Sequence, residues 1–240
     1  MSRKYLGSSY EKNLKTSYKI LDPIQRNKSK IPHGHDFWNA YEFTYLDKNH
    51  LPVLKVLELT IPASSKNIVE SKSLKIYLNS FYNKKFNKSS EVLDIIKIDL
   101  DKLTKSNIKI KFVKKFLNEP DALKINTSKL LITPKNKIIY FSGFRSICPV
   151  TSQPDFANIY IKSNAEIEIT WLNDYLRSYK EKGDFHEQCI EGIFEEIKKR
   201  YQPSKLEVCG RFMRRGGIDI NPVRSLNKRF TFKNFRFFNQ

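Results

Sequence analysis

The hydrophobic residues of this chain follow strand and helix periods in an order that occurs twice, and this order restricts the fold more than any other feature. Residues 37–46 and 53–61 are rich in strand formers and flank a polar Asp-Lys-Asn turn, which predicts a β-hairpin. Two apolar stripes with helical spacing follow, formed by Leu74, Tyr77, Leu78 and Phe81 and by Val92, Ile96, Leu100 and Leu103. Ile108, Ile110 and Phe112 then alternate with lysines, which is typical of a half-buried strand.

The second half reads in a similar order without detectable residue-by-residue identity. The elements expected there are a strand-turn-strand over 129–145, a strand over 157–169, helices over 171–181 and 184–200, a strand at 206–212 and an aromatic strand over 229–238. Hairpins flanking helix pairs favour an α+β fold with antiparallel sheets, each with a helix pair on one face. We expect two domains, residues 1–118 and 119–240, joined in the polar stretch 118–128.

Charge and composition favour some classes of partner and argue against some kinds of site, but they do not identify the function. The chain has 44 Lys and Arg against 25 Asp and Glu, a net charge of +19, which favours an anionic partner such as nucleic acid or phosphate. The lysines are scattered, however, so drift in composition on a solvated surface explains them equally well. Three cysteines without CxxC spacing argue against a disulfide framework and a four-cysteine zinc site, and we expect no metal.

Targeting segments and glycine motifs are absent from the sequence. The N-terminus has no apolar region typical of a signal peptide, and no run approaches the ~18 apolar residues of a membrane span. We therefore expect a cytoplasmic protein that needs no membrane. Neither G-x-G-x-x-G nor G-x-x-x-x-G-K-[ST] occurs, so a bound nucleotide would be held without the common glycine loops.

The segment CPVTSQPD, Cys148 to Asp155, is the first of four clusters that can carry chemistry. Pro149 and Pro154 oppose regular structure, which predicts a shaped loop that presents a thiol and a carboxyl group. A thiolate is a strong nucleophile, and a nearby carboxylic acid can donate a proton. A buried inert cysteine beside a turn aspartate is the alternative interpretation.

The segment GDFHEQ, residues 183–188, is the second cluster. Asp184 and Glu187 have the spacing of a capping box at the start of a helix. That interpretation leaves His186 unexplained, although a lone histidine at a helix start is often only a surface residue.

Basic residues at two further places could bind phosphate. Asn67 and Glu70 predict a second capping box before a helix that carries Ser71, Lys72 and Lys75, and helix N-termini attract anions. The segment 211–222 places Arg211, Arg214 and Arg215 before Gly216 and Gly217, which allow close backbone approach. A solvated helix face and a basic turn are the plainer interpretations.

Taken together, these clusters resemble one family. ESKSLKIY at 70–77, SICPVTSQPD at 146–155, FHE at 185–187 and RRGGIDINP at 214–222 resemble the motifs of the queuosine-pathway nitrile reductases, the NADPH-dependent 7-cyano-7-deazaguanine reductases. Pieces near the N-terminus, including Tyr5-Leu6-Gly7 and Tyr41-Glu42, are similar as well. The order of the motifs is that of the long form, which implies two tandem tunnelling-fold (T-fold) units. Because the sheets of such units leave open edges, we expect a symmetric homo-oligomer, a homodimer.

The resemblance also implies roles for individual residues. Cys148 would attack the nitrile carbon to form a thioimide and Asp155 would protonate the nitrogen, with two NADPH molecules reducing nitrile to amine. The implied substrate contacts are Val69, Glu70, Ser71, His186 and Glu187. The implied cofactor contacts are Ser71, Lys72, Lys75, Arg215 and Gly216. A small deazapurine would be the substrate, and nucleic acid would not be required.

Three other functions remain open at this point. A pterin or GTP cyclohydrolase of the same superfamily would normally need zinc. A basic RNA-binding module would explain the charge of +19 and the twelve tyrosines but not the cysteine loop. A degenerate reductase kept as a scaffold would not need the Cys, Asp, His and Glu of the motifs.

Overall fold

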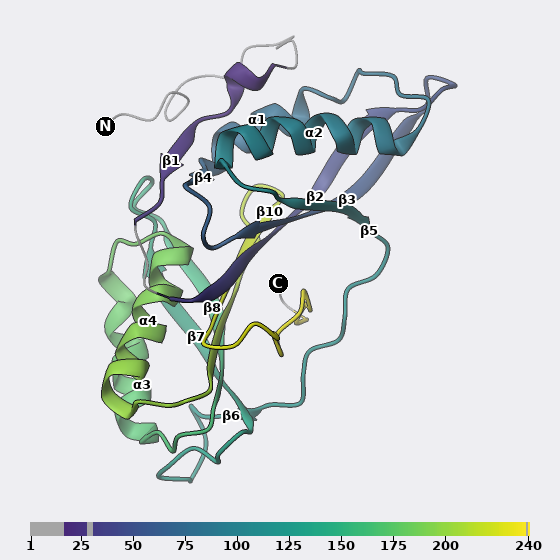
Figure 1. Ribbon diagram of the computed structural model, residues 1–240. Coiled ribbons are helices and arrows are strands. Elements are labelled where there is room, and N and C mark those ends of the chain that lie inside the picture. The colour runs from purple at the N-terminus through teal and green to yellow at the C-terminus, as the bar shows by residue number, and fades with distance from the viewer. Residues whose placement is uncertain (1–16, 28–30, 239) are drawn as a thin grey trace. The chain divides into compact units, whose positions relative to one another are not determined.

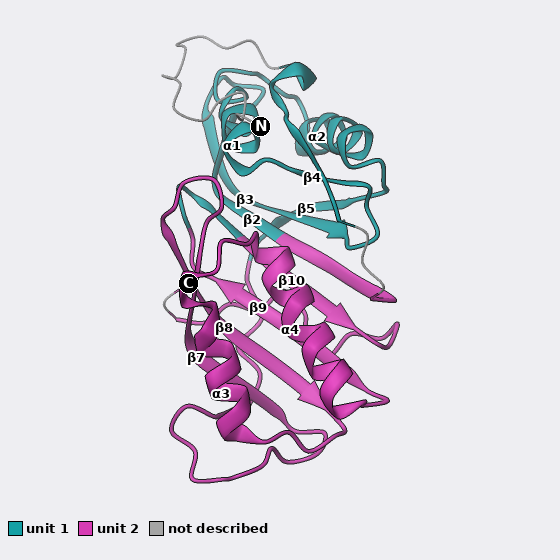
Figure 2. Ribbon diagram, turned by 90° about the vertical axis from the view of Figure 1, so that its left-hand side faces the viewer, with its two compact units in different colours: residues 1–28, 38–114, 215–219 teal, residues 29–37, 115–214, 220–240 magenta. Residues whose placement is uncertain are grey.

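The computed structural model describes residues 17–27, 31–238 and 240, so Tyr5, Leu6 and Gly7 lie outside the described residues. The chain divides into two compact units, which Figure 2 colours separately. Unit 1 comprises residues 1–28, 38–114 and 215–219, and unit 2 comprises residues 29–37, 115–214 and 220–240. The sequence-based domain boundary between residues 118 and 119 stays a prediction.

Unit 1 combines strands with two helices. Its elements are a 3₁₀ turn (Tyr18–Ile20), β1 (Pro23–Gln25), most of β2 (His33–Leu46), β3 (Pro52–Pro62), β4 (Asn67–Val69), α1 (Ser71–Asn79), α2 (Ser89–Thr104) and β5 (Lys109–Val113). Strand β3 lies between β2 and β5 and pairs with β5 in antiparallel register, while β1 and β4 form a separate antiparallel pair. Helices α1 and α2 lie over one face of β2, β3 and β5 (Figure 1).

The hairpin expected between residues 37 and 61 is confirmed by β2 and β3. Its turn depends on Asp47, whose carboxylate accepts from the Asn49 and Leu51 N–H groups at 2.8 and 2.9 Å. An Asp side chain that bonds the backbone two residues on is a standard way to close a turn. The register of β2 therefore has a local cause.

The two helical stripes of unit 1 are confirmed as buried faces. Leu74 and Tyr77 of α1 are almost completely buried, as are Val92, Ile96, Leu100 and Leu103 of α2. Helix α1 ends at Asn79, so Phe81 lies beyond it. Phe81 is still fully buried, and its ring lies 5.8 Å from that of Phe43.

Unit 2 is built on antiparallel strands with a helix pair. Its elements are β6 (Leu123–Lys124), β7 (Ile138–Ile147), β8 (Pro154–Ser163), α3 (Ile169–Arg177), a 3₁₀ turn (Ser178–Glu181), α4 (His186–Tyr201), β9 (Leu206–Phe212) and most of β10 (Ile218–Ser225). The strand order is β10-β9-β8-β7-β6, antiparallel except for the parallel pair β6–β7.

Helices α3 and α4 cover one face of the unit 2 strands, as Figures 1 and 2 show. Ile190, Ile193 and Ile197 of α4 are fully buried in one apolar cluster with Ile159 and Ile161 of β8. Both units thus place a helix pair on one face of mainly antiparallel strands, which confirms the α+β class.

The aromatic strand expected over 229–238 is wrong. This segment packs as an irregular cover on unit 2, where Phe232 and Phe235 are buried against Tyr160 and Val223. The N–H groups of Thr231 and Phe232 donate to the Glu207 carboxylate at 2.8 and 2.7 Å. A side chain therefore satisfies donors that a strand would have used in a ladder.

Residues 129–132 also fail to form the expected strand. Leu130, Leu131 and Ile132 are 47, 77 and 48% exposed, and only Ile132 makes an isolated bridge, to Glu168. Pro134 follows them and has no N–H for a ladder. The sequence-based expectation also missed β10, because the glycines before it indicated only a turn.

A buried ion triad joins three elements of unit 2. The Arg224 guanidinium on β10 is fully buried and donates to Asp36 of β2 at 2.7 Å and to Glu191 of α4 at 2.7 Å. The two carboxylates raise the pKa of Arg224 against the opposing effect of burial. Buried charges persist only when paired in this way.

We expect Arg224→Met to lower the free energy of unfolding by about 3–5 kcal/mol, because it removes the buried cation that pairs with Asp36 and Glu191. Urea titration measures this loss. Arg177→Met is the control, since Arg177 pairs with Asp174 at 3.8 Å on the surface with both side chains at least 70% exposed. The control should cost less than about 1 kcal/mol. Equal losses in the two variants would contradict the role of the triad.

Candidate active site

Cys148 lies where β7 ends, in the loop of residues 148–153 that leads to β8. The Cys148 N–H donates to the Gln153 carbonyl and the Ser152 N–H donates to the Cys148 carbonyl, both at 2.9 Å. These two bonds close the loop, and Ser152 takes a φ of 56° to allow it. Cys148 is only half-buried, so solvent and small molecules can reach this loop.

Asp155 is the second residue of β8 and lies opposite Ser146 of β7. Opposed residues of an antiparallel pair point to the same face, and so do residues two apart on one strand. The Cys148–Gln153 bond continues the pairing to the cysteine, so Cys148 and Asp155 share a face. The carboxyl group is 4% exposed.

His186 is the first residue of α4 and meets Asp155 on that face. Its Nε2 lies 3.3 Å from Asp155 Oδ2, and its side chain is 13% exposed. The imidazole stacks on the Phe212 ring with centroids 3.8 Å apart and planes within 4°. Among the described residues, His186 Nδ1 has no hydrogen-bond partner. The His186 imidazole is thus held in place by stacking on the Phe212 ring and by its contact with the Asp155 carboxylate.

The start of α4 differs from the expected capping box. Phe185 is the N-cap residue, and its N–H donates to the Gln188 side chain at 3.1 Å. Asp184 instead pairs with Lys182 at 2.9 Å, so the expectation for Asp184 and Glu187 was wrong. The Glu187 carboxylate lies in the first turn of α4, where the helix dipole favours negative charge, and it is 3% exposed.

The other two thiols lie in different surroundings from Cys148. Burial raises the pKa of Cys189 to about 12, with Asp184 and Asp155 adding to the rise. Burial also raises the pKa of Cys209 to about 12. Both side chains are fully buried. Neither can supply a thiolate near neutral pH.

The N-terminus of α1 in unit 1 depends on Glu70. Its carboxylate accepts from the Lys72 N–H at 2.9 Å and from the Ser73 N–H at 2.6 Å, so Glu70 is the N-cap. Asn67 lies in β4 and donates to the Leu103 carbonyl, which makes the expected Asn67–Glu70 capping box wrong. Since Glu70 occupies two of the helix's first N–H groups, an anion here would depend on side chains such as those of Ser71 and Lys72.

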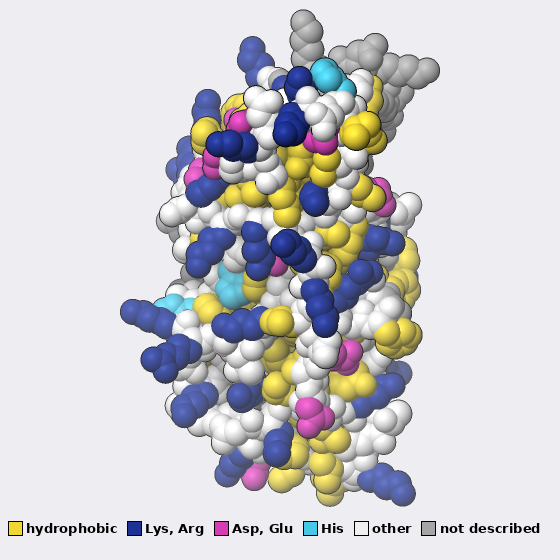
Figure 3. Space-filling view, turned by 90° about the vertical axis from the view of Figure 1, so that its right-hand side faces the viewer, with side chains coloured by type: hydrophobic (Ala, Val, Ile, Leu, Met, Phe, Trp, Pro, Cys, Tyr) yellow, Lys and Arg dark blue, Asp and Glu magenta, His cyan; other side chains and the backbone are white. Residues whose placement is uncertain are grey.

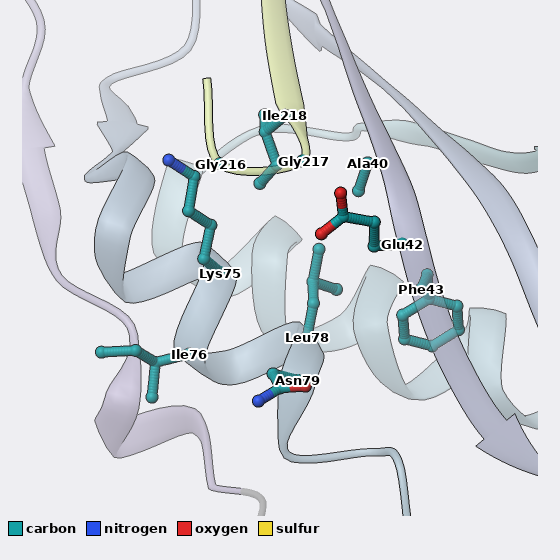
Figure 4. Close-up of a pocket in the computed structure, with 10 residues that line it drawn as sticks. All are labelled: Ala40, Glu42, Phe43, Lys75, Ile76, Leu78, Asn79, Gly216, Gly217 and Ile218. Carbon is teal, nitrogen blue, oxygen red and sulfur yellow. The ribbon is translucent and has the colours of Figure 1, made fainter. Parts of the chain in front are cut away.

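Unit 1 also contains a pocket of about 330 Å³ between β2, α1 and the turn at residues 215–218. Lys75 and Glu42 extend into it from α1 and β2, as Figure 4 shows. Its apolar lining comes from Ala40, Phe43, Ile76, Leu78 and Ile218. Lys75 and Gly216 thus lie next to each other in the pocket lining, while Val69 is buried at the end of β4.

The turn at residues 215–218 requires its two glycines. Gly216 and Gly217 have φ values of 55° and 77°, where side chains are rarely tolerated. A Cβ on Gly216 would lie 3.0 Å from Lys75 Nζ, and one on Gly217 would lie 2.6 Å from Glu42 Oε2. Asp219 anchors the turn by accepting from Asn39 at 2.7 Å and from the Tyr41 hydroxyl.

Sequence reasoning assigned no role to Glu42, which lines the pocket, or to Phe212, which stacks on His186. Glu42 stands among apolar residues of a strand, and a lone charge in such a run is the signal that could have indicated a site. Phe212 was assigned only to a strand face, because nothing local shows that His186, 26 residues earlier, stacks on it. The structure brings Asp155 and His186 together in unit 2, and Lys75 and Gly216 together in unit 1.

Metal and membrane features are absent from the part of the chain that the structure describes. No group of three or more His, Cys, Asp or Glu side chains there could hold a metal ion. None of the described helices has the length and apolar character that crossing a membrane requires. On the face drawn in Figure 3, Lys and Arg are scattered rather than gathered into one stripe.

Comparison with known proteins gives matches over most of the chain. A family model described as nitrile reductase, 7-cyano-7-deazaguanine-reductase N-term, matches residues 15–112, and one described as QueF-like protein matches residues 154–230. An NADPH-dependent 7-cyano-7-deazaguanine reductase of Buchnera aphidicola is 38% identical over 87% of this chain and 92% of its own.

Two further relatives carry the same name. That of Coxiella burnetii is 36% identical over 89% of this chain and 85% of its own, and that of Paraburkholderia phymatum is 35% identical over 91% and 90%. A solved structure, the archaeosine synthase QueF-Like in the apo form, shows 16% identity over 42% of this chain and 98% of its own. Its TM-score of 0.35 is too low to bear on the fold.

The burial of the three thiols predicts their reactivity. We expect a disulfide reagent at pH 8 to label Cys148 in the native protein, while Cys189 and Cys209 react only after unfolding. Release of the coloured thiol counts the labelled residues, and peptide mass spectrometry identifies them. Labelling of Cys189 or Cys209 before Cys148 would contradict this description of the site.

Proposed function

The chain belongs to the family of 7-cyano-7-deazaguanine nitrile reductases, and from this premise we propose that it reduces the nitrile of 7-cyano-7-deazaguanine to an aminomethyl group with NADPH. This reaction is a step in the biosynthesis of queuosine, a modified nucleoside of tRNA. The observation that supports it most is the meeting of Asp155 and His186 on the face that the half-buried Cys148 shares.

Cys148 is the nucleophile in this proposal. Its sulfur forms a bond to the nitrile carbon, and the triple bond becomes the C=N bond of a thioimide. Asp155 donates the proton that the nitrogen needs, so the addition expels nothing. His186, 3.3 Å from Asp155, holds that carboxyl group in place. NADPH supplies the reducing equivalents in two successive rounds when it is bound.

The proposed substrate contacts form two groups of residues. In unit 2, His186 and Glu187 form hydrogen bonds with the edge of the deazaguanine ring. The nearly buried Glu187 carboxylate accepts hydrogen bonds from the N–H groups of that ring. In unit 1, Val69, Glu70 and Ser71 are the proposed contacts. The backbone around β4 and α1 is fixed there by the Glu70 cap.

The proposed cofactor contacts are Ser71, Lys72, Lys75, Arg215 and Gly216, and the residues fit an anionic dinucleotide. Lys75 Nζ lies beside Gly216, where a Cβ would come within 3.0 Å of it. The absence of a side chain at Gly216 therefore lets the turn backbone and the Lys75 ammonium group contact the same ligand atoms. The Lys72 and Arg215 side chains can pair with the phosphate oxygens of the cofactor. The positive charge also favours NADPH over NADH.

We further propose that the units are tandem tunnelling-fold domains, residues 1–118 and 119–240, and that the protein is cytoplasmic. The substrate is a small deazapurine, and nucleic acid is not required for the reaction.

Trapping the nitrile tests the mechanism. Adding 7-cyano-7-deazaguanine without NADPH should raise the protein mass by the whole nitrile, on Cys148, because addition has no leaving group. Cys148→Ala should abolish the adduct and turnover, and Asp155→Asn should lower turnover at least about 100-fold through loss of the proton donor. Intact-protein mass spectrometry and the nicotinamide absorbance are the measurements.

Cys209→Ala is the matched control and should still form the adduct, because that thiol is fully buried. An adduct on Cys189 or Cys209, or full turnover by Cys148→Ala, would end this mechanism.

Sheets with open edges tend to pair, and we therefore propose a homodimer. Light scattering at micromolar concentration should give twice the mass of one chain. A monodisperse monomer would refute the dimer.

A further inference from the structure

Glu42 places a carboxylate in the pocket of unit 1, and the resemblance assigns no role to this residue. It projects from β2 opposite Lys75 of α1, with the turn of Gly216 and Gly217 between them (Figure 4). Its strand neighbours Tyr41 and Phe43 are buried, whereas Glu42 itself is exposed. The strand therefore directs this one acid toward the pocket and away from the core.

The contacts of Glu42 leave its carboxylate available to a ligand. Among the described residues, no hydrogen bond or ion pair joins its side-chain oxygens to the protein. Gly217 lies so close that a Cβ there would sit 2.6 Å from Glu42 Oε2. The glycine turn thus makes room for the carboxylate against the backbone.

Most of the residues that line the pocket are apolar. Phe43, Ile76, Leu78 and Ile218 are apolar, and the volume of about 330 Å³ is at the small end of the ~300–1,000 Å³ typical of ligand pockets. Such a space takes one ring and its sugar rather than a whole dinucleotide. Lys75 supplies a donor and Glu42 an acceptor, which match the carbonyl and the NH₂ of a carboxamide.

The negative charge of Glu42 favours the nicotinamide end of the dinucleotide over its phosphate-bearing end. The adenosine end of NADPH carries a 2′-phosphate, which the Glu42 carboxylate would repel. The nicotinamide end carries a carboxamide, and its neutral ring would become a pyridinium cation on giving up a hydride, which is two electrons and one proton. A carboxylate beside the ring favours that cation.

We propose that Glu42 binds the nicotinamide end of the cofactor and selects its oxidised, positively charged form. The inference rests on the proposed function, because it takes NADPH as the reductant. Glu42 is then a residue that lowers the barrier of each reduction, since positive charge develops on the ring in the transition state.

Glu42→Gln tests this, because it keeps the shape and removes the charge. Calorimetric titration should show NADP⁺ binding weakened about tenfold, roughly 1.4 kcal/mol, and NADPH binding weakened about threefold or less. Adenosine 2′,5′-bisphosphate, which lacks nicotinamide, should bind unchanged. The extra loss for NADP⁺ should shrink at high salt.

Asp94→Asn is the matched control, because Asp94 is an exposed acid of α2 in the same unit and its loss removes the same charge. It should leave all three affinities unchanged. If Glu42→Gln weakened the binding of NADP⁺ and NADPH equally, the role of Glu42 would be merely structural and the proposal would be overturned. A change confined to binding of the bisphosphate, or no change in any affinity, would also overturn it. A wild-type protein that fails to bind NADPH would instead overturn the proposed function as well.

Discussion

The buried ion triad of Arg224, Asp36 and Glu191 is the constraint on which the geometry of unit 2 depends. It joins β10, β2 and α4, and two of its three charged groups, Arg224 and Asp36, are fully buried. Glu191 lies one helical turn after Glu187, so the same contact fixes the rotation of the turn that begins with His186. The position of the imidazole against Phe212 and Asp155 follows from that rotation.

Unit 1 uses an analogous device on a smaller scale. Asp219 accepts from Asn39 and Tyr41 of β2, and the Tyr41 N–H donates to the Gly217 carbonyl at 2.9 Å. These bonds hold the glycine turn beside Lys75 and Glu42. In each unit a buried charged side chain, Arg224 or Asp219, holds a segment of backbone in place. His186 lies on the segment held in unit 2, and the glycine turn is the segment held in unit 1.

Much of the fold could be predicted because its causes are local. The stripe of Val92, Ile96 and Leu100 and the Asp47 turn each act within a few residues, and they predicted α2 and the hairpin correctly. The clusters around Cys148 and His186 were identified from residue types and motif resemblance. Their roles stay predictions, although the structure brings Asp155 and His186 together.

The features that could not be predicted depend on distant contacts. Arg224 and Asp36 are 188 residues apart, and no local pattern shows that they pair. Residues 229–238 have a strand-like composition, but the Glu207 carboxylate takes their N–H groups and the strand is lost. Capping failed for a related reason: Glu70 caps α1 by itself, while Asn67 is held by Leu103 of another helix.

The stoichiometry of the complete reaction tests the central claim most directly. With limiting 7-cyano-7-deazaguanine and excess NADPH, loss of nicotinamide absorbance should stop at about two NADPH per nitrile, and mass spectrometry should find the aminomethyl product. Two equivalents are required because a nitrile needs four electrons to become an amine. NADPH loss that does not depend on the nitrile, or a nitrile recovered unchanged, would contradict the account.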